Sequence, residues 1–341
     1  VTGVQTCALP ILSRMQQFKD LIIKGSEHLR AGEFAKAQKV SQKLIKAGLA
    51  QGYLLKFQAH QKRDQTQEAL KILREYTVAF PKDLIAWKTL AEFCRDQDFF
   101  DEGIMAYDQA LECHEAPLEK IYLARASTLL RASRYEEALV DLEKISDSGE
   151  MSLPVRVMKL SCYNGLDQCA KSLERAPEIL ADIEMIGEEV LENSIPMLNY
   201  NTRFEIARAN WNIHKDQSKS LQNLFQALRF IQVAPPPALQ LLREINSQDT
   251  NAECKLFEVI ISAKTKVPTM EHGHPHDEFV RQYEVMAEDP DECLEFICEL
   301  ETQIKSNSLR IRKVGDANNQ VDGDLKGVYF QSLPELLHNH H

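Results

Sequence analysis

One short segment of the sequence carries residue types that could bind a metal ion. Its ligand candidates are three histidines in five residues and the aspartate that follows them: His272, His274, His276 and Asp277. Imidazole and carboxylate groups are ligands of Zn²⁺ and of other transition metals. A glycine and a proline lie between the histidines, so the segment also fits a polar hairpin loop. The loop is the simpler interpretation, because no second ligand cluster is evident apart from the C-terminal His338, His340 and His341.

The sequence contains no motif that predicts catalysis. It has no phosphate-binding Walker loop, no dinucleotide-binding glycine pattern and no Gly-x-Ser-x-Gly elbow. The eight cysteines form no Cys-x-x-Cys pair, and we interpret them as small core residues. We therefore expect a protein that is not an enzyme and has no cofactor. A metal-binding or enzymatic protein with its site near residues 272–277 is the alternative.

Composition and charge narrow the classes of partner. The 341 residues carry 40 Lys and Arg against 51 Asp and Glu, for a net charge of -11. An acidic chain is poorly suited to nonspecific nucleic-acid binding, which needs a positive face. No run approaches the roughly 20 apolar residues of a membrane-spanning helix. Scattered cysteines without a disulfide framework are typical of reduced, cytoplasmic proteins. We expect a bacterial cytoplasmic location, with neither nucleic acid nor membrane as partner.

The first eleven residues differ from the rest of the chain. Val1–Ile11 carries no charge and does not belong to the helical pattern that follows it. The segment resembles a translated sequencing-library adapter, so we set residues 1–11 aside as an artefact.

A repeat of about 34 residues follows. Small residues stand 32, 34 and 35 positions apart at Ala37, Ala69, Gly103 and Ala138. Twelve positions before them lie Gly25, Phe57, Ala91 and Ala126, three of them small. Three positions before them lie Phe34, Thr66, Phe100 and Tyr135, three of them aromatic. Such small positions let two helices approach closely, while the aromatic side chain fills the space between them.

This pattern resembles the tetratricopeptide repeat. The third unit matches best, through Trp87, Leu90, Ala91, Tyr107 and Ala110. The resemblance implies a solenoid of helical hairpins over residues 12–247. The pattern is clear over 15–145 and weak over 151–233, where a non-repeating bundle is an equal alternative.

The resemblance also implies a concave groove lined by the first helix of each hairpin. Heat-shock co-chaperones of this family carry a Lys, Asn and Arg clamp there, whereas the matching positions here are Ile22, Ser26, Leu55, Ile85 and Thr89. We therefore expect no carboxylate-clamp partner. The groove candidates include seven basic residues, Lys19, Arg30, Lys62, Lys88, Arg95, Lys120 and Arg131, against two acidic ones, Glu92 and Asp96. A basic strip would attract an acidic segment of a partner protein.

The chain changes character after Pro235-Pro236-Pro237. Residues 250–335 are expected to form a small α+β domain of order β-β-α-β, with a further strand near 328–330 as a possibility. The expected strands are Glu253–Ala263, Glu278–Met286 and Ser308–Val314. Asp289 followed by proline predicts a helix start, and the apolar face of that helix comprises Cys293, Phe296, Ile297, Leu300 and Ile304.

The predicted fold is thus mainly α: a tetratricopeptide-type solenoid followed by a small α+β domain. The predicted function is a non-enzymatic adaptor or scaffold that binds another protein in its groove. A secretion-system chaperone or an immunity-type protein is a further alternative.

Overall fold

The computed structural model describes residues 8–114, 116–146, 148–149, 151–186, 195–246, 254–271, 274–301, 304–305, 308–317, 326–332 and 335–336. The side chains of residues 8–14, 267–276 and 335–336 lie outside this description. The chain divides into two compact units, Val1–Ser146 and Asp147–His341.

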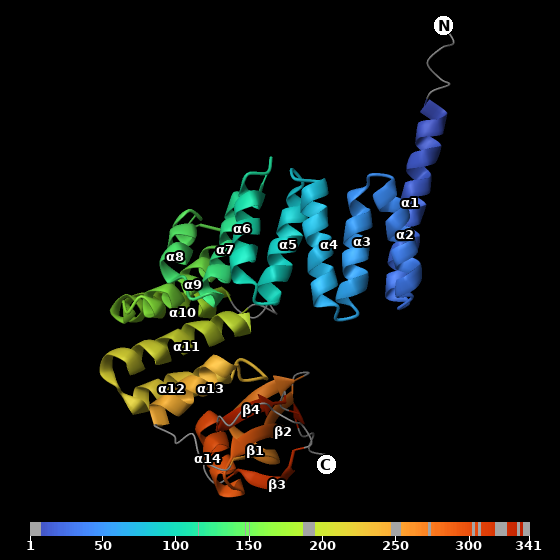
Figure 1. Ribbon diagram of the computed structural model, residues 1–341. Helices are drawn as coiled ribbons and strands as arrows, with labels where there is room; N and C mark the ends of the chain where they lie inside the picture. Colours follow the sequence, from blue (N-terminus) through green and yellow to red (C-terminus); the bar gives the residue numbers. More distant parts are fainter. Residues whose placement is uncertain are drawn as a thin grey trace. The chain divides into compact units, whose positions relative to one another are not determined.

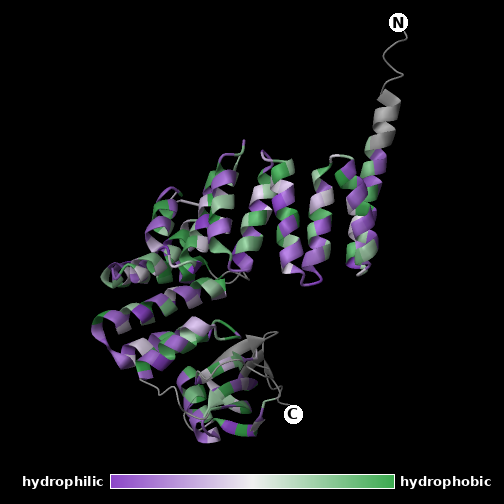
Figure 2. Ribbon diagram, viewed as in Figure 1, coloured by the Kyte–Doolittle hydropathy of each residue, from purple (hydrophilic) through white to green (hydrophobic). Residues whose placement is uncertain are grey.

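The described part of the first unit consists of eight helices that form four antiparallel hairpins (Figure 1). Their bounds are α1 (Ala8–Arg30), α2 (Phe34–Lys46), α3 (Ala50–Gln61), α4 (Thr66–Ala79), α5 (Leu84–Asp96), α6 (Phe100–Leu111), α7 (Leu118–Arg131) and α8 (Tyr135–Glu143). Apolar residues recur among polar ones along the coloured helices, as expected of helices that bury one face (Figure 2).

One turn geometry joins the two helices of every hairpin. The turn residue has a left-handed backbone, with φ of 72° at Gly32, 54° at Asp64, 60° at Asp98 and 57° at Ser133. The next residue donates its N–H to a carbonyl five positions back, as Phe99 does to Cys94 at 2.8 Å. This bond is the helix-ending Schellman arrangement. The turn residues are 32, 34 and 35 positions apart, so the predicted helical repeat is confirmed.

Buried small residues hold the hairpins together. Ala37, Ala69 and Ala138 are fully buried. At Gly52, an added Cβ would lie 2.7 Å from the backbone nitrogen of Ile45, so only glycine permits this approach of α3 to α2. The rings of Phe57 and Phe93 pack edge to face at 5.2 Å. The bulky residue at the second unit's usual small position is therefore accommodated by an aromatic pair.

In the second unit, the described residues before the sheet form five further helices. These are α9 (Ser152–Gly165), α10 (Cys169–Ile186), α11 (Ile195–His214), α12 (Gln217–Leu228) and α13 (Pro236–Asn246). The turn between α9 and α10 repeats the left-handed geometry at Asp167, 34 positions after Ser133. Tyr200 and Leu224 share one core with the strand residue Tyr283. The helices α11–α13 thus share one core with the sheet and belong to the same compact unit.

The described strands form one antiparallel sheet of order β3-β1-β2-β4, with β5 also paired to β2. The elements are β1 (Lys255–Glu271), β2 (His274–Ala287), α14 (Pro290–Leu300), β3 (Arg310–Asp316), β4 (Gly327–Gln331) and β5 (Glu335–Leu336). The predicted α+β class is confirmed, including the N-cap: Asp289 accepts from the N–H groups of Asp291 and Glu292 at 2.9 Å.

Two details of the predicted α+β elements are corrected. The helix ends at Leu300, so Ile304 is not on its apolar face but in an isolated bridge with Thr265. The strands β1 and β2 pair up to Glu271 opposite His274. His274 and His276 therefore lie in a strand, because strand pairing extends almost to the hairpin tip.

Candidate functional site

Five of the seven predicted basic groove residues occupy two sets of equivalent positions in the first halves of the hairpins. Arg30, Lys62 and Arg131 each stand two positions before a turn residue, whereas Lys19 and Lys120 stand thirteen positions before one. These five side chains are exposed, as is Lys88, while Arg95 is half-buried. We call this set of seven the first-helix face; six lie on α1, α5 and α7, and Lys62 directly follows α3.

Three of these seven cations are already paired with carboxylates of the same unit. Lys88 lies 3.5 Å from Glu92. Arg95 lies 3.0 Å from Asp96, and Arg131 donates to Asp98 at 2.7 Å. Each pair places a negative charge beside the positive one, so these positions attract an anion less than the sequence count suggests.

Four cations on the first-helix face have no such partner. Lys19, Arg30, Lys62 and Lys120 form no ion pair with any residue that the structure describes. Two apolar side chains on the first helices of their hairpins, Ile23 of α1 and Ile85 of α5, are 58% and 56% exposed. The arrangement can therefore bind a segment that combines carboxylates with an apolar side chain. The sequence already placed Ile85 among the groove positions, whereas Ile23 was not predicted to be part of the groove.

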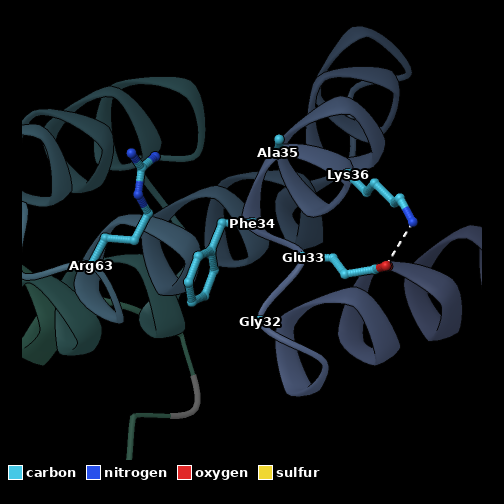
Figure 3. A pocket seen from close by; sticks show the side chains of 6 residues that line it. All are labelled: Gly32, Glu33, Phe34, Ala35, Lys36 and Arg63. Atoms are coloured by element: carbon cyan, nitrogen blue, oxygen red, sulfur yellow. Dashed lines mark hydrogen bonds and ion pairs between the residues drawn. The ribbon is translucent and has the colours of Figure 1, made fainter.

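A hollow of about 470 Å³ lies beside the start of α2 (Figure 3). It is lined by Gly32, Glu33, Phe34, Ala35, Lys36 and Arg63. Glu33 bonds to Lys36 and His28, both at 2.6 Å, and these bonds lower the pKa of the Glu33 carboxyl. The carboxylate of Glu33 at this hollow is thus already bonded to neighbouring side chains, and the exposed guanidinium of Arg63 lies at the other side.

A second hollow, of about 480 Å³, lies along α9 and α10. Its basic residues include Arg156, whose guanidinium is paired with both Asp182 and Glu178. This internal pairing makes it a weaker candidate for anion binding than the first-helix face.

The structure describes only part of the predicted metal segment. His272 lies outside the described residues, as do the side chains of His274 and His276. Asp277 accepts a hydrogen bond from Lys305 at 3.0 Å, which lowers the pKa of its carboxyl. Among the described residues no group of three or more His, Cys, Asp or Glu could hold a metal ion. The metal site stays a prediction.

Three buried cysteines are held in their neutral form. Burial raises the pKa of Cys94, Cys162 and Cys293 to about 12. Partial burial also raises the pKa of Cys298, but its side chain is exposed to the reagent. We therefore expect the three buried thiols to react with a disulfide reagent at pH 8 at least about a hundredfold more slowly than Cys298, because only an accessible thiolate reacts. Time-resolved thiol titration checks this, with a fully denatured sample as control. A uniform native rate would contradict it.

Among known proteins, this chain is similar only to solved structures. No protein-family profile matches the chain, and no curated protein matches its sequence. A tetratricopeptide repeat protein from Parabacteroides merdae is 14% identical, with 68% of this chain and 100% of that chain covered and a TM-score of 0.44. MamA from Desulfovibrio magneticus is 14% identical, with 53% and 94% covered and a TM-score of 0.42. YrrB, described as a repeat protein with an unusual peptide-binding site, is 12% identical, with 63% and 98% covered and a TM-score of 0.42. The repeat fold itself is established by the hairpin geometry above.

None of the described helices is both long enough and apolar enough to cross a membrane.

Proposed function

We propose that the first unit is a non-catalytic scaffold whose first-helix face binds an acidic segment of a partner protein. Stacked helical hairpins present long, rigid faces, which suits protein binding in general. The observation that carries the proposal is a set of four cations with no ion-pair partner among the residues that the structure describes: Lys19, Arg30, Lys62 and Lys120.

The charge distribution favours a carboxylate-bearing partner. A lysine or arginine that is already paired must break its ion pair before it binds a carboxylate of the partner. An unpaired one can form the new ion pair without breaking an old one. Ile23 and Ile85 would add apolar contacts, and these contacts would not weaken with salt. The partner segment we propose is therefore acidic with at least one apolar anchor.

Charge reversal at the unpaired positions tests this function. In the variant Lys19→Glu, Lys62→Glu, Lys120→Glu, we expect recovery of partner proteins from the native lysate to fall at least about tenfold. Quantitative mass spectrometry of the captured proteins measures the effect. Purified candidates are then bound directly to both proteins.

A matched control carries the same change in net charge elsewhere. Lys82, Lys219 and Lys255 are exposed, lie outside the first-helix face and form no ion pair within the described part of the chain. Their triple reversal to glutamate should leave partner recovery unchanged. Equal recovery by the two triple variants would overturn the proposed site.

A further inference from the structure

The second helices of the hairpins change from basic to acidic along the first unit. Four positions after each turn residue lie Lys36, Glu68, Glu102 and Glu137. Fourteen positions after the first three turn residues lie Lys46, Val78 and Glu112. Equivalent positions share one local geometry. The change of charge between hairpins therefore comes from the residue types and not from where the residues lie.

The helix α2 presents a continuous basic stripe. Lys36, Lys39, Lys43 and Lys46 are all exposed and recur at helical spacing. Only Lys36 has an ion-pair partner in the described structure, namely Glu33. We call these four residues the α2 lysine stripe.

The helices α6 and α8 present the opposite charge. Their exposed acidic residues, together with the residue that follows α6, are Asp101, Asp108, Glu112, Glu136, Glu137 and Glu143, which we call the acidic face. Two arginines connect the helices: Arg125 pairs with Asp108 on α6 and Asp141 on α8, and Arg134 pairs with Asp101 on α6 and Glu137 on α8. Glu112, Glu136 and Glu143 remain without an ion pair among the described residues.

The sequence of the first unit divides its charge in the same way. Residues 12–82 carry 14 Lys and Arg against 6 Asp and Glu, whereas residues 83–146 carry 7 against 14. Each copy of the chain therefore carries one basic surface and one acidic surface, and all copies carry the same two.

From this complementarity, we infer that the α2 lysine stripe docks on the acidic face of a second copy of this chain. The two surfaces have similar length: Lys36 to Lys46 spans about 15 Å of helix, and Asp101 to Glu112 about 16 Å. The acidic face also exposes Met105 and Val140, at 60% and 52%. The aliphatic parts of the lysine side chains can cover these two apolar groups.

The contact joins two different surfaces, so the interface is heterologous. A linear assembly of copies then has a free lysine stripe at one end and a free acidic face at the other. It uses none of the cations of the first-helix face and is independent of the proposed function.

Sedimentation of the full chain at several protein concentrations tests the inference. At 50 mM NaCl we expect the average mass to rise with concentration. At 500 mM NaCl we expect the association constant to fall at least about tenfold, because salt screens exposed charges. A wild-type protein that stays monomeric at 50 mM NaCl would overturn the inference.

A charge-swap experiment identifies the surfaces. Variant A carries Lys39→Glu, Lys43→Glu and Lys46→Glu, and variant B carries Glu112→Lys, Glu136→Lys and Glu143→Lys. These six residues are exposed and form no ion pair within the described chain, so circular dichroism and the melting temperature should match wild type. Each variant alone should be monomeric, and an equimolar mixture should associate again. Failure of the mixture to associate would contradict the assignment.

Two further arms separate the docking of these two surfaces from a general effect of net charge and from lipid binding. The triple reversal at Lys82, Lys219 and Lys255 changes net charge as variant A does and should leave self-association intact. Vesicles of phosphatidylglycerol at 50 mM NaCl test an anionic lipid surface as the alternative occupant. A monomeric wild type that binds these vesicles through the lysine stripe would replace self-association with lipid binding.

Discussion

Replacing Asp141 by alanine is expected to lower the free energy of unfolding of the first unit by about 3 kcal/mol. The Asp141 side chain is 2% exposed, and its two oxygens accept from Nε and Nη2 of Arg125, both at 2.7 Å. Lys144 donates to the same carboxylate at 3.2 Å. Removal of Asp141 leaves Arg125, itself only 15% exposed, without its main partner. Arg125 keeps its second partner, Asp108, so the expected loss is near the lower end of the range for breaking a buried ion pair.

The matched control for Asp141 is Asp108→Ala. Asp108 pairs with the same arginine but is 49% exposed, so its removal should cost less than about 1 kcal/mol. Each unit has one tryptophan, Trp87 and Trp211. Urea unfolding in a Trp211→Phe background therefore reports on the first unit alone. Equal costs for the two aspartate variants would contradict the role of burial.

Replacing Glu301 by alanine is expected to lower the free energy of unfolding of the second unit by about 3–4 kcal/mol. Glu301 is 5% exposed, accepts from the hydroxyl of the fully buried Tyr283 at 2.6 Å, and pairs with the guanidinium of Arg281. Burial raises the pKa of Tyr283 well above its usual value, so its hydroxyl remains a neutral donor. Without Glu301, a charge and a hydroxyl would both lose their buried partner.

The control for Glu301 is Tyr283→Phe. It removes one hydrogen bond and keeps the ion pair, so its expected cost is about 1 kcal/mol. Urea unfolding followed by Trp211 fluorescence in a Trp87→Phe background measures both variants. A Glu301→Ala cost no larger than that of Tyr283→Phe would show that the ion pair does not stabilise the unit.

The helical repeat could be predicted because its signals are local and recur. Small residues such as Ala69 and Ala138 must be buried for two helices to pack closely, and their spacing is visible in one dimension. The start of α14 was predictable for the same reason, since Asp289 caps N–H groups only two and three residues away.

The division into units was not predictable in the same way. The triple proline marks a change of local pattern, but α11–α13 bury their apolar faces with β2 through Tyr200 and Tyr283. Such contacts join residues more than eighty positions apart, and no local pattern records them. The strand position of His274 and His276 likewise depends on pairing with β1.

The sequence by itself determined the repeat length, the α+β class of the last part and the total charge. Only the tertiary structure decided which cations have an ion-pair partner among the residues that it describes. Arg131 is paired because Asp98, 33 positions earlier, lies 2.7 Å away, whereas Lys120 has no such neighbour within the described chain. The physical reason is that electrostatic energy depends on distance through space, and distance along the chain does not reveal it.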